Sequence, residues 1–113
     1  MITIYHNPRC GKSREGLQLL ESLDKPFTTV KYLDTPFSKK ELTSLLEKLD
    51  IKPLELVRQK EAVWIENYKD KTMTDDEVIE AMLVHPKLIE RPIVVNGEKA
   101  VIARPAWRIN AIL

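Results

Sequence analysis

The stretch ITIYHNPRCGKSR, residues 2–14, decides the fold of this 113-residue chain. Apolar and polar side chains alternate over residues 2–5, which is typical of a short β-strand. Asn7-Pro8 then breaks the strand, and a helical pattern begins near Ser13. A strand therefore passes into a helix across a short loop, and the loop carries Cys10.

Cys10 is the only cysteine of the chain. The unpaired amides of a first helical turn, together with the nearby Arg9, Lys12 and Arg14, would stabilise a thiolate over a thiol. We therefore predict that Cys10 is a nucleophile, the alternative being a small buried core residue. Because Ser13 stands where a resolving cysteine would lie, the second thiol of a redox cycle must come from another molecule.

Composition limits the classes of function. Eighteen basic and seventeen acidic side chains leave a net charge of +1. This net charge gives no overall electrostatic attraction to nucleic acid or to a membrane. One cysteine forms no internal disulfide, and we see neither a signal-peptide pattern nor a membrane-spanning apolar run, so we expect a cytoplasmic protein. We expect no metal site, because one cysteine and two distant histidines form no recognisable ligand set. A monomer is the simplest expectation for the oligomeric state.

The remaining elements follow from local patterns. A helix over residues 13–23 and an aromatic and β-branched strand over residues 27–33 complete a βαβ unit. Capping boxes at Ser38/Glu41 and Thr74/Glu77 open two further helices, the second ending at His85-Pro86, and a short helix begins at Pro53. Residues 67–73 are polar and uncapped, which indicates a mobile loop.

The last third of the chain indicates a β-hairpin followed by a helix. Strands over residues 93–95 and 100–102 flank Asn96-Gly97, whose positive φ angles would suit a two-residue turn. Pro105 suits the first turn of a closing helix, in which Trp107 falls at helical spacing with Ile112 and is expected in the core.

These elements predict an α/β fold in one domain, residues 1–113. The order is β-α-β, a helical insert over roughly 38–89, then β-β-α, with a four-stranded mixed sheet. This is the order of thioredoxin-like folds of the glutaredoxin type, in which the nucleophilic cysteine lies where the first strand meets the first helix. Pro92 opens the third strand, and we predict that its peptide bond is cis, the alternative being a trans proline at a strand start.

Several separated motifs carry a resemblance to a known family. They are His6-Asn7-Pro8-x-Cys10 with Ser13, the Leu-x-Arg segment around Arg58, Glu90-Arg91-Pro92, and Arg104-Pro105. In this order and spacing the chain resembles, over nearly its whole length, the ArsC family of glutaredoxin-linked arsenate reductases, and most closely the branch that carries Arg-Cys-x-Lys-Ser.

The resemblance implies roles for individual residues. Arg58, Arg91 and Arg104 would bind a tetrahedral oxyanion through their guanidinium groups, and Gly11 would allow its close approach. For any one of these arginines, a solvated surface side chain is the alternative.

Three further residues surround the thiol in this interpretation. His6 would lower the thiol pKa as an imidazolium, the alternative being a satisfied histidine at a strand end. Ser13 would donate a hydrogen bond to the thiolate or help to cap the first helix. Asn7 would shape the loop through hydrogen bonds from its side chain to the backbone.

The implied function is reduction of arsenate to arsenite by Cys10, with glutathione as cosubstrate, glutaredoxin as partner and no bound cofactor. Two alternatives stay open: an Spx-like regulator that binds RNA polymerase, and a thiol reductase of the same fold that acts on another oxyanion or a glutathione adduct. A phosphatase-like reductase is excluded, because its phosphate loop needs an arginine six residues after the cysteine and this chain has Gly16 there.

Overall fold

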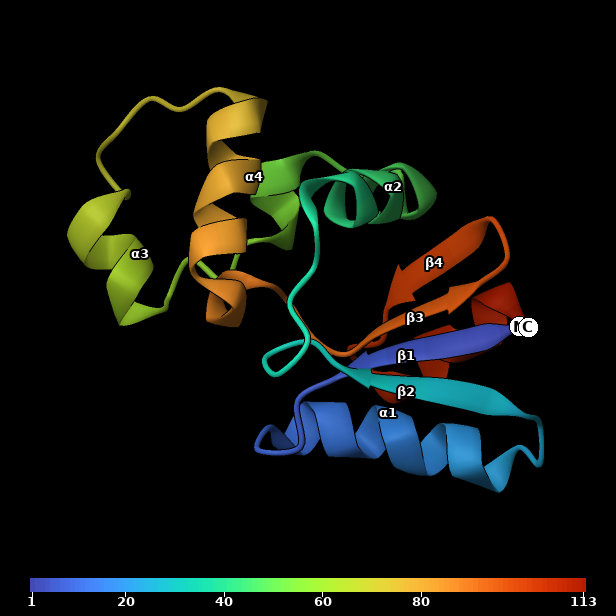
Figure 1. Ribbon diagram of the computed structural model, residues 1–113. Helices are drawn as coiled ribbons and strands as arrows, with labels where there is room; N and C mark the ends of the chain where they lie inside the picture. Colours follow the sequence, from blue (N-terminus) through green and yellow to red (C-terminus); the bar gives the residue numbers. More distant parts are fainter. The chain divides into compact units, whose positions relative to one another are not determined.

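The computed structural model describes all residues, 1–113, and contains one four-stranded sheet. Its strand order is β2-β1-β3-β4, with β2 and β1 parallel and the other neighbours antiparallel (Figure 1). The strands are β1 (Ile2–His6), β2 (Phe27–Lys31), β3 (Ile93–Asn96) and β4 (Lys99–Ile102). The predicted α/β fold with a four-stranded mixed sheet is confirmed. Strand β2 ends two residues before its predicted end.

The chain forms two compact units. The first comprises residues 1–35 and 91–113 and contains the sheet, α1 (Gly11–Ser22) and η3 (Ala106–Ile112). The second comprises residues 36–90, and the helical insert expected over roughly 38–89 falls within it. No helix is long and apolar enough to cross a membrane.

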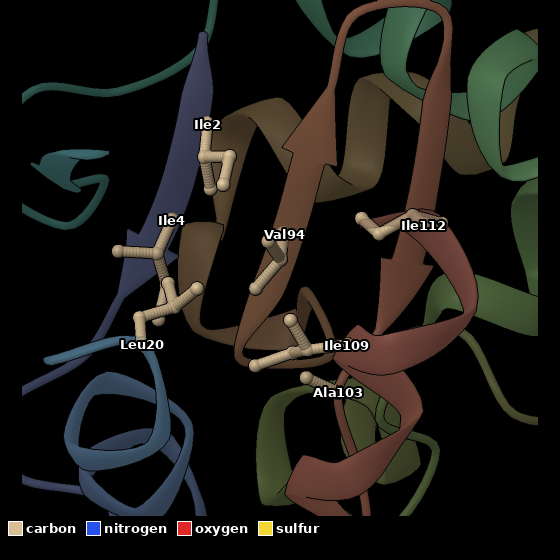
Figure 2. Close-up of a cluster of buried hydrophobic side chains, with 7 residues drawn as sticks. All are labelled: Ile2, Ile4, Leu20, Val94, Ala103, Ile109 and Ile112. Atoms are coloured by element: carbon tan, nitrogen blue, oxygen red, sulfur yellow. The ribbon is translucent and has the colours of Figure 1, made fainter. Parts of the chain in front are cut away.

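The core of the first unit lies between the sheet and the helices α1 and η3. Ile4, Leu20, Val94 and Ile109 are almost completely buried there, and Figure 2 shows their side chains converging from β1, α1, β3 and η3. The alternation over residues 2–5 produces this arrangement, because every second side chain of a strand points to the same face. Strand β1 ends at His6, immediately before Asn7-Pro8, and the loop that follows leads into α1.

The second unit contains helical segments and one isolated antiparallel bridge, Val57–Ile89. The helical segments are α2 (Lys39–Leu49), η1 (Pro53–Leu56), α3 (Ala62–Asn67), α4 (Asp75–Val84) and η2 (Pro86–Leu88). Both predicted capping boxes are present: the Glu41 amide donates to the Ser38 hydroxyl at 3.1 Å, and the Glu77 amide donates to the Thr74 hydroxyl at 3.2 Å. Helix α3 was not predicted, because its six residues are too few to show a periodicity.

Two predictions for the last third of the chain are wrong. Trp107 is 65% exposed and not in the core, because the closing element is a 3-10 helix with a different angular spacing, which buries Ile109 and Ile112. The hairpin turn consists of Gly97 and Glu98, since Asn96 still pairs with Lys99. Only Gly97 there has a positive φ, +64°, as a turn with glycine at its first central position requires.

Candidate active site

Cys10 occupies the N-cap position of α1, with an extended backbone and a half-buried thiol. Burial acts to raise the pKa of Cys10, but three groups outweigh it: the backbone amide of Ser13, the Arg91 guanidinium, and the backbone amide of Lys12. Together they hold the pKa of the thiol below its ordinary value. The amides are two of the unpaired donors that every helix start presents. The sulfur is therefore poised to ionise, as a nucleophile must be.

The loop before the helix is folded by Asn7. Its side-chain Oδ1 accepts a hydrogen bond from the Arg9 amide at 3.0 Å, and its carbonyl accepts one from the Cys10 amide at 3.1 Å. Asn7 is itself buried. The predicted contact from the Asn7 side chain to the backbone is thus present, and it fixes the position of the cysteine backbone relative to β1.

A buried polar network lies behind the cysteine loop. Ser13 is fully buried, and its hydroxyl accepts a hydrogen bond from the Asn7 amide at 2.9 Å and lies 2.8 Å from Nδ1 of His6, which is also buried. The hydroxyl proton is satisfied when it points to Nδ1, with the imidazole proton on Nε2. The Ser13 hydroxyl is then engaged on the side of His6, and the Ser13 backbone amide acts on the thiol.

This network changes the expected role of Ser13. The N-cap residue Cys10 makes no side-chain cap on α1, and the partners of the Ser13 hydroxyl are His6 and the Asn7 amide, so a capping role for Ser13 stays a prediction. Ser13 is the third residue of α1, and its hydroxyl reaches His6 at the end of β1. The Ser13 amide favours the thiolate form of Cys10, and the Ser13 hydroxyl joins the loop to β1.

His6 is in an environment that favours the neutral ring. Burial lowers its pKa, the charges of Lys31 and Arg14 lower it further, and a backbone hydrogen bond with Ser13 only partly opposes them. This runs against the expected imidazolium, because desolvation disfavours the charged form of histidine. Here His6 serves Ser13 as a hydrogen-bond partner. The effect of Lys31 could not be foreseen, since Lys31 becomes a neighbour only through the β1–β2 pairing with His6.

The Arg91 guanidinium hydrogen-bonds the thiol of Cys10. The Arg91–Pro92 peptide bond is cis, as predicted, and Pro92 is buried. A Cβ atom on Gly16 would lie only 2.7 Å from Cγ of Pro92, so this proline packs directly on the backbone of α1. An arginine at position 16, which a phosphate loop would need, has no room there.

Arg104 lies one residue beyond a backbone contact with the Pro92 segment. The Ala103 amide donates to the Pro92 carbonyl at 2.9 Å, so Arg91 and Arg104 flank the same hydrogen bond in the first unit. The Arg104–Pro105 bond is also cis. A Cβ atom on Gly11 would meet nothing closer than Arg14 Nη2 at 3.7 Å, so protein packing alone does not require glycine there.

Arg58 belongs to the second unit and is engaged by two carboxylates. Its Nη1 hydrogen-bonds Oε1 of Glu61, and its Nε lies 3.4 Å from Oε1 of Glu90. Its place in an oxyanion pocket stays a prediction. Sequence reasoning missed both glutamates, although the three-residue spacing of Arg58 and Glu61 and the adjacency of Glu90 to Arg91 were visible signals.

The structure brings together no three His, Cys, Asp or Glu side chains that could hold a metal ion. The chemical groups at Cys10 are a thiol of lowered pKa, two helix-start amides and one guanidinium. This combination can attack an electrophile and hold negative charge that develops beside the sulfur.

Two relatives match this chain over nearly the full length of both proteins. YfgD, an uncharacterized protein of Escherichia coli K12, is 44% identical over 99% of this chain and 96% of its own. A protein of Neisseria meningitidis named arsenate reductase is 41% identical over 99% of this chain and 97% of its own.

A solved structure is similar to this chain over nearly its whole length. The arsenate reductase of Vibrio cholerae superposes with a TM-score of 0.94 at 43% identity, covering 99% of this chain and 97% of that one. The sequence profile of the ArsC family matches residues 5–112, which include the cysteine loop, all three candidate arginines and both cis prolines. The chain therefore belongs to the ArsC family.

Proposed function

We propose that this protein is an arsenate reductase that uses Cys10 as its nucleophile, glutathione as cosubstrate and glutaredoxin as the final thiol donor. The observation that carries the proposal is the Cys10 thiol, whose pKa is held low by the amides of Ser13 and Lys12 and by Arg91. Relatives named arsenate reductase, 38–41% identical over nearly the whole chain, support arsenate as the substrate.

The first step is formation of a sulfur–arsenic bond. The Cys10 thiolate attacks As(V), one As–O bond breaks, and the departing hydroxyl takes a proton and leaves as water. Arg91 and Arg104, with Arg58 as the third predicted ligand, would hold the remaining oxygens and offset their charge. No electron has yet moved, because arsenic is still As(V) in the adduct.

The second step transfers two electrons. A glutathione thiolate attacks the Cys10 sulfur, the S–S bond forms, and the S–As bond breaks with its electron pair left on arsenic. Arsenite leaves as As(III), and the two thiols have become a mixed disulfide. Because the chain holds no second cysteine, an external thiol of glutaredoxin then attacks the glutathione sulfur and releases the Cys10 thiolate.

The test is a coupled turnover assay with arsenate, glutathione and glutaredoxin, run beside a version coupled to thioredoxin. We expect turnover with glutaredoxin and none in a Cys10→Ser variant whose circular dichroism matches the wild type. Substantial turnover by Cys10→Ser would contradict the mechanism. Activity in neither coupling would favour a thiol reductase acting on another oxyanion, and stable capture of RNA polymerase that alters transcription would favour a regulator.

A further inference from the structure

Arg58, Glu61 and Glu90 form a charged cluster in the second unit. One guanidinium contacts two carboxylates, at Nη1 and at Nε, so the cluster carries a formal charge of −1. The three side chains are only 24–28% exposed, so water screens them less than it would screen a surface ion pair. Arg58 is therefore already paired with carboxylates before any anion binds.

The backbone around the cluster is held in place by hydrogen bonds. The Arg58 amide donates to the Leu88 carbonyl at 2.7 Å, and the Glu90 amide donates to the Leu56 carbonyl at 2.9 Å, around the antiparallel bridge of Val57 and Ile89. The Glu61 amide donates to the Arg58 carbonyl at 3.1 Å. A rearrangement at Arg58 is therefore a change of side-chain contacts, while the backbone stays in position.

The two glutamates leave Arg58 no unused edge for an oxyanion. A guanidinium grips a tetrahedral anion through a pair of neighbouring nitrogens, either Nε with Nη2 or Nη1 with Nη2. Glu90 contacts the first pair at Nε, and Glu61 contacts the second at Nη1. A two-point grip on an anion must therefore reuse a nitrogen that a glutamate already contacts.

We propose that Glu61 limits the affinity of the oxyanion site: its carboxylate contacts Arg58 in the free protein, and a bound oxyanion must displace that carboxylate from Arg58. The inference rests on the proposed function, in which Arg58 is a substrate ligand. Displacement changes the partner of Arg58 from an internal carboxylate to the substrate, so Glu61 weakens binding of every oxyanion that Arg58 contacts. Glu61 is singled out because it hydrogen-bonds Arg58, whereas Glu90 contacts Arg58 only as an ion pair at 3.4 Å.

The test is Glu61→Gln, which keeps the size of the side chain and removes its charge. We expect the KM for arsenate to fall about two- to fivefold with little change in kcat, the range that loss of a partly exposed ion pair gives. Glu66→Gln is the matched control: it removes the same charge from the exposed side of α3 and should leave KM unchanged. In an Arg58→Gln background, Glu61→Gln should have no further effect on KM.

A binding measurement separates this inference from the proposed function. Arsenate and inorganic phosphate should each protect Cys10 from alkylation by iodoacetamide, and the protecting concentration should fall in Glu61→Gln by the same factor as KM. One outcome is that the wild type fails to turn over arsenate while the protecting concentration still falls in Glu61→Gln. In that case the proposed function fails, but the inference that Glu61 competes with oxyanions for Arg58 is supported. An unchanged or raised KM in Glu61→Gln, an equal fall in Glu66→Gln, or a fall that persists without Arg58 overturns the inference.

Discussion

Nδ1 of His6 lies 2.8 Å from the hydroxyl oxygen of Ser13, and both residues are buried. The same hydroxyl accepts the Asn7 amide at 2.9 Å, so one side chain of α1 joins the end of β1 to the start of the cysteine loop. This contact links the buried strand β1 to the Cys10 thiol, because the backbone amide of Ser13 is a donor that lowers the pKa of Cys10.

Substitution of Ser13→Ala should damage both stability and reactivity. The buried Asn7 amide loses its acceptor and His6 Nδ1 its partner, which costs about 1–3 kcal/mol of free energy of unfolding. The thiol pKa should rise as the helix start shifts. Urea denaturation and the pH dependence of Cys10 alkylation measure the two effects. Ser22→Ala, which removes an exposed hydroxyl that donates to Leu19 within the same helix, is the control, and an equal loss there would contradict the prediction.

Replacing His6 with asparagine should leave the thiol pKa below its ordinary value. An asparagine amide can reach the position of Nδ1 and keep the hydrogen bond to Ser13, but it carries no charge. Since the environment favours neutral His6, the thiolate does not depend on an imidazolium. Alkylation rates of Cys10 across pH 5–9 test this. A thiol pKa restored to its ordinary value in His6→Asn would show that the charge of the ring is needed.

The same histidine should make the fold sensitive to acid. Its pKa is lowered on folding from an ordinary value of 6.5, so the unfolded chain binds a proton more readily. The contribution of neutral His6 is present above pH 6.5 and is lost as the pH falls through the lowered value. In urea unfolding at a series of pH values from 7 to 5, the free energy of unfolding should fall with pH. The fall should be less steep in His6→Asn than in the wild type. Identical slopes in the two proteins would contradict this.

Arg91→Gln should raise the pKa of Cys10, because the thiol then loses a hydrogen bond and a positive charge. We expect slower alkylation of Cys10 at pH 7 and a higher KM for arsenate. Arg108→Gln removes the same charge from an exposed position and should leave both quantities unchanged. If the two variants behave alike, the effect of Arg91 is one of overall charge and not of contact with the thiol.

Gly16→Ala should destabilise the fold by about 1–3 kcal/mol, the usual cost of overpacking a filled space. The new methyl group would lie 2.7 Å from Cγ of Pro92, and either α1 or the Pro92 segment must move. Gly11→Ala is the control, because its methyl group meets nothing closer than 3.7 Å and the free energy of unfolding should stay near that of the wild type. Thermal and urea unfolding measure both. Equal stability of the two variants would contradict the close packing.

The sequence by itself determined what depends on neighbours along the chain. The alternation of residues 2–5 indicates β1, the capping boxes at Ser38 and Thr74 indicate α2 and α4, and these elements form as predicted. The position of Cys10 before a helix already indicated a stabilised thiolate, since the unpaired amides are a property of the helix start.

Only the tertiary structure decided which partners those residues meet. Pairing of β3 with β4 moved the hairpin turn to Gly97-Glu98, the geometry of the last helix left Trp107 exposed, and burial against β1 directed the Ser13 hydroxyl to His6. The carboxylates that contact Arg58 come from Glu61, three residues on, and from Glu90, 32 residues on in a bridged segment. Hydrogen bonds and charges act over a few ångströms in space, so residues distant in sequence become partners only when packing brings them together.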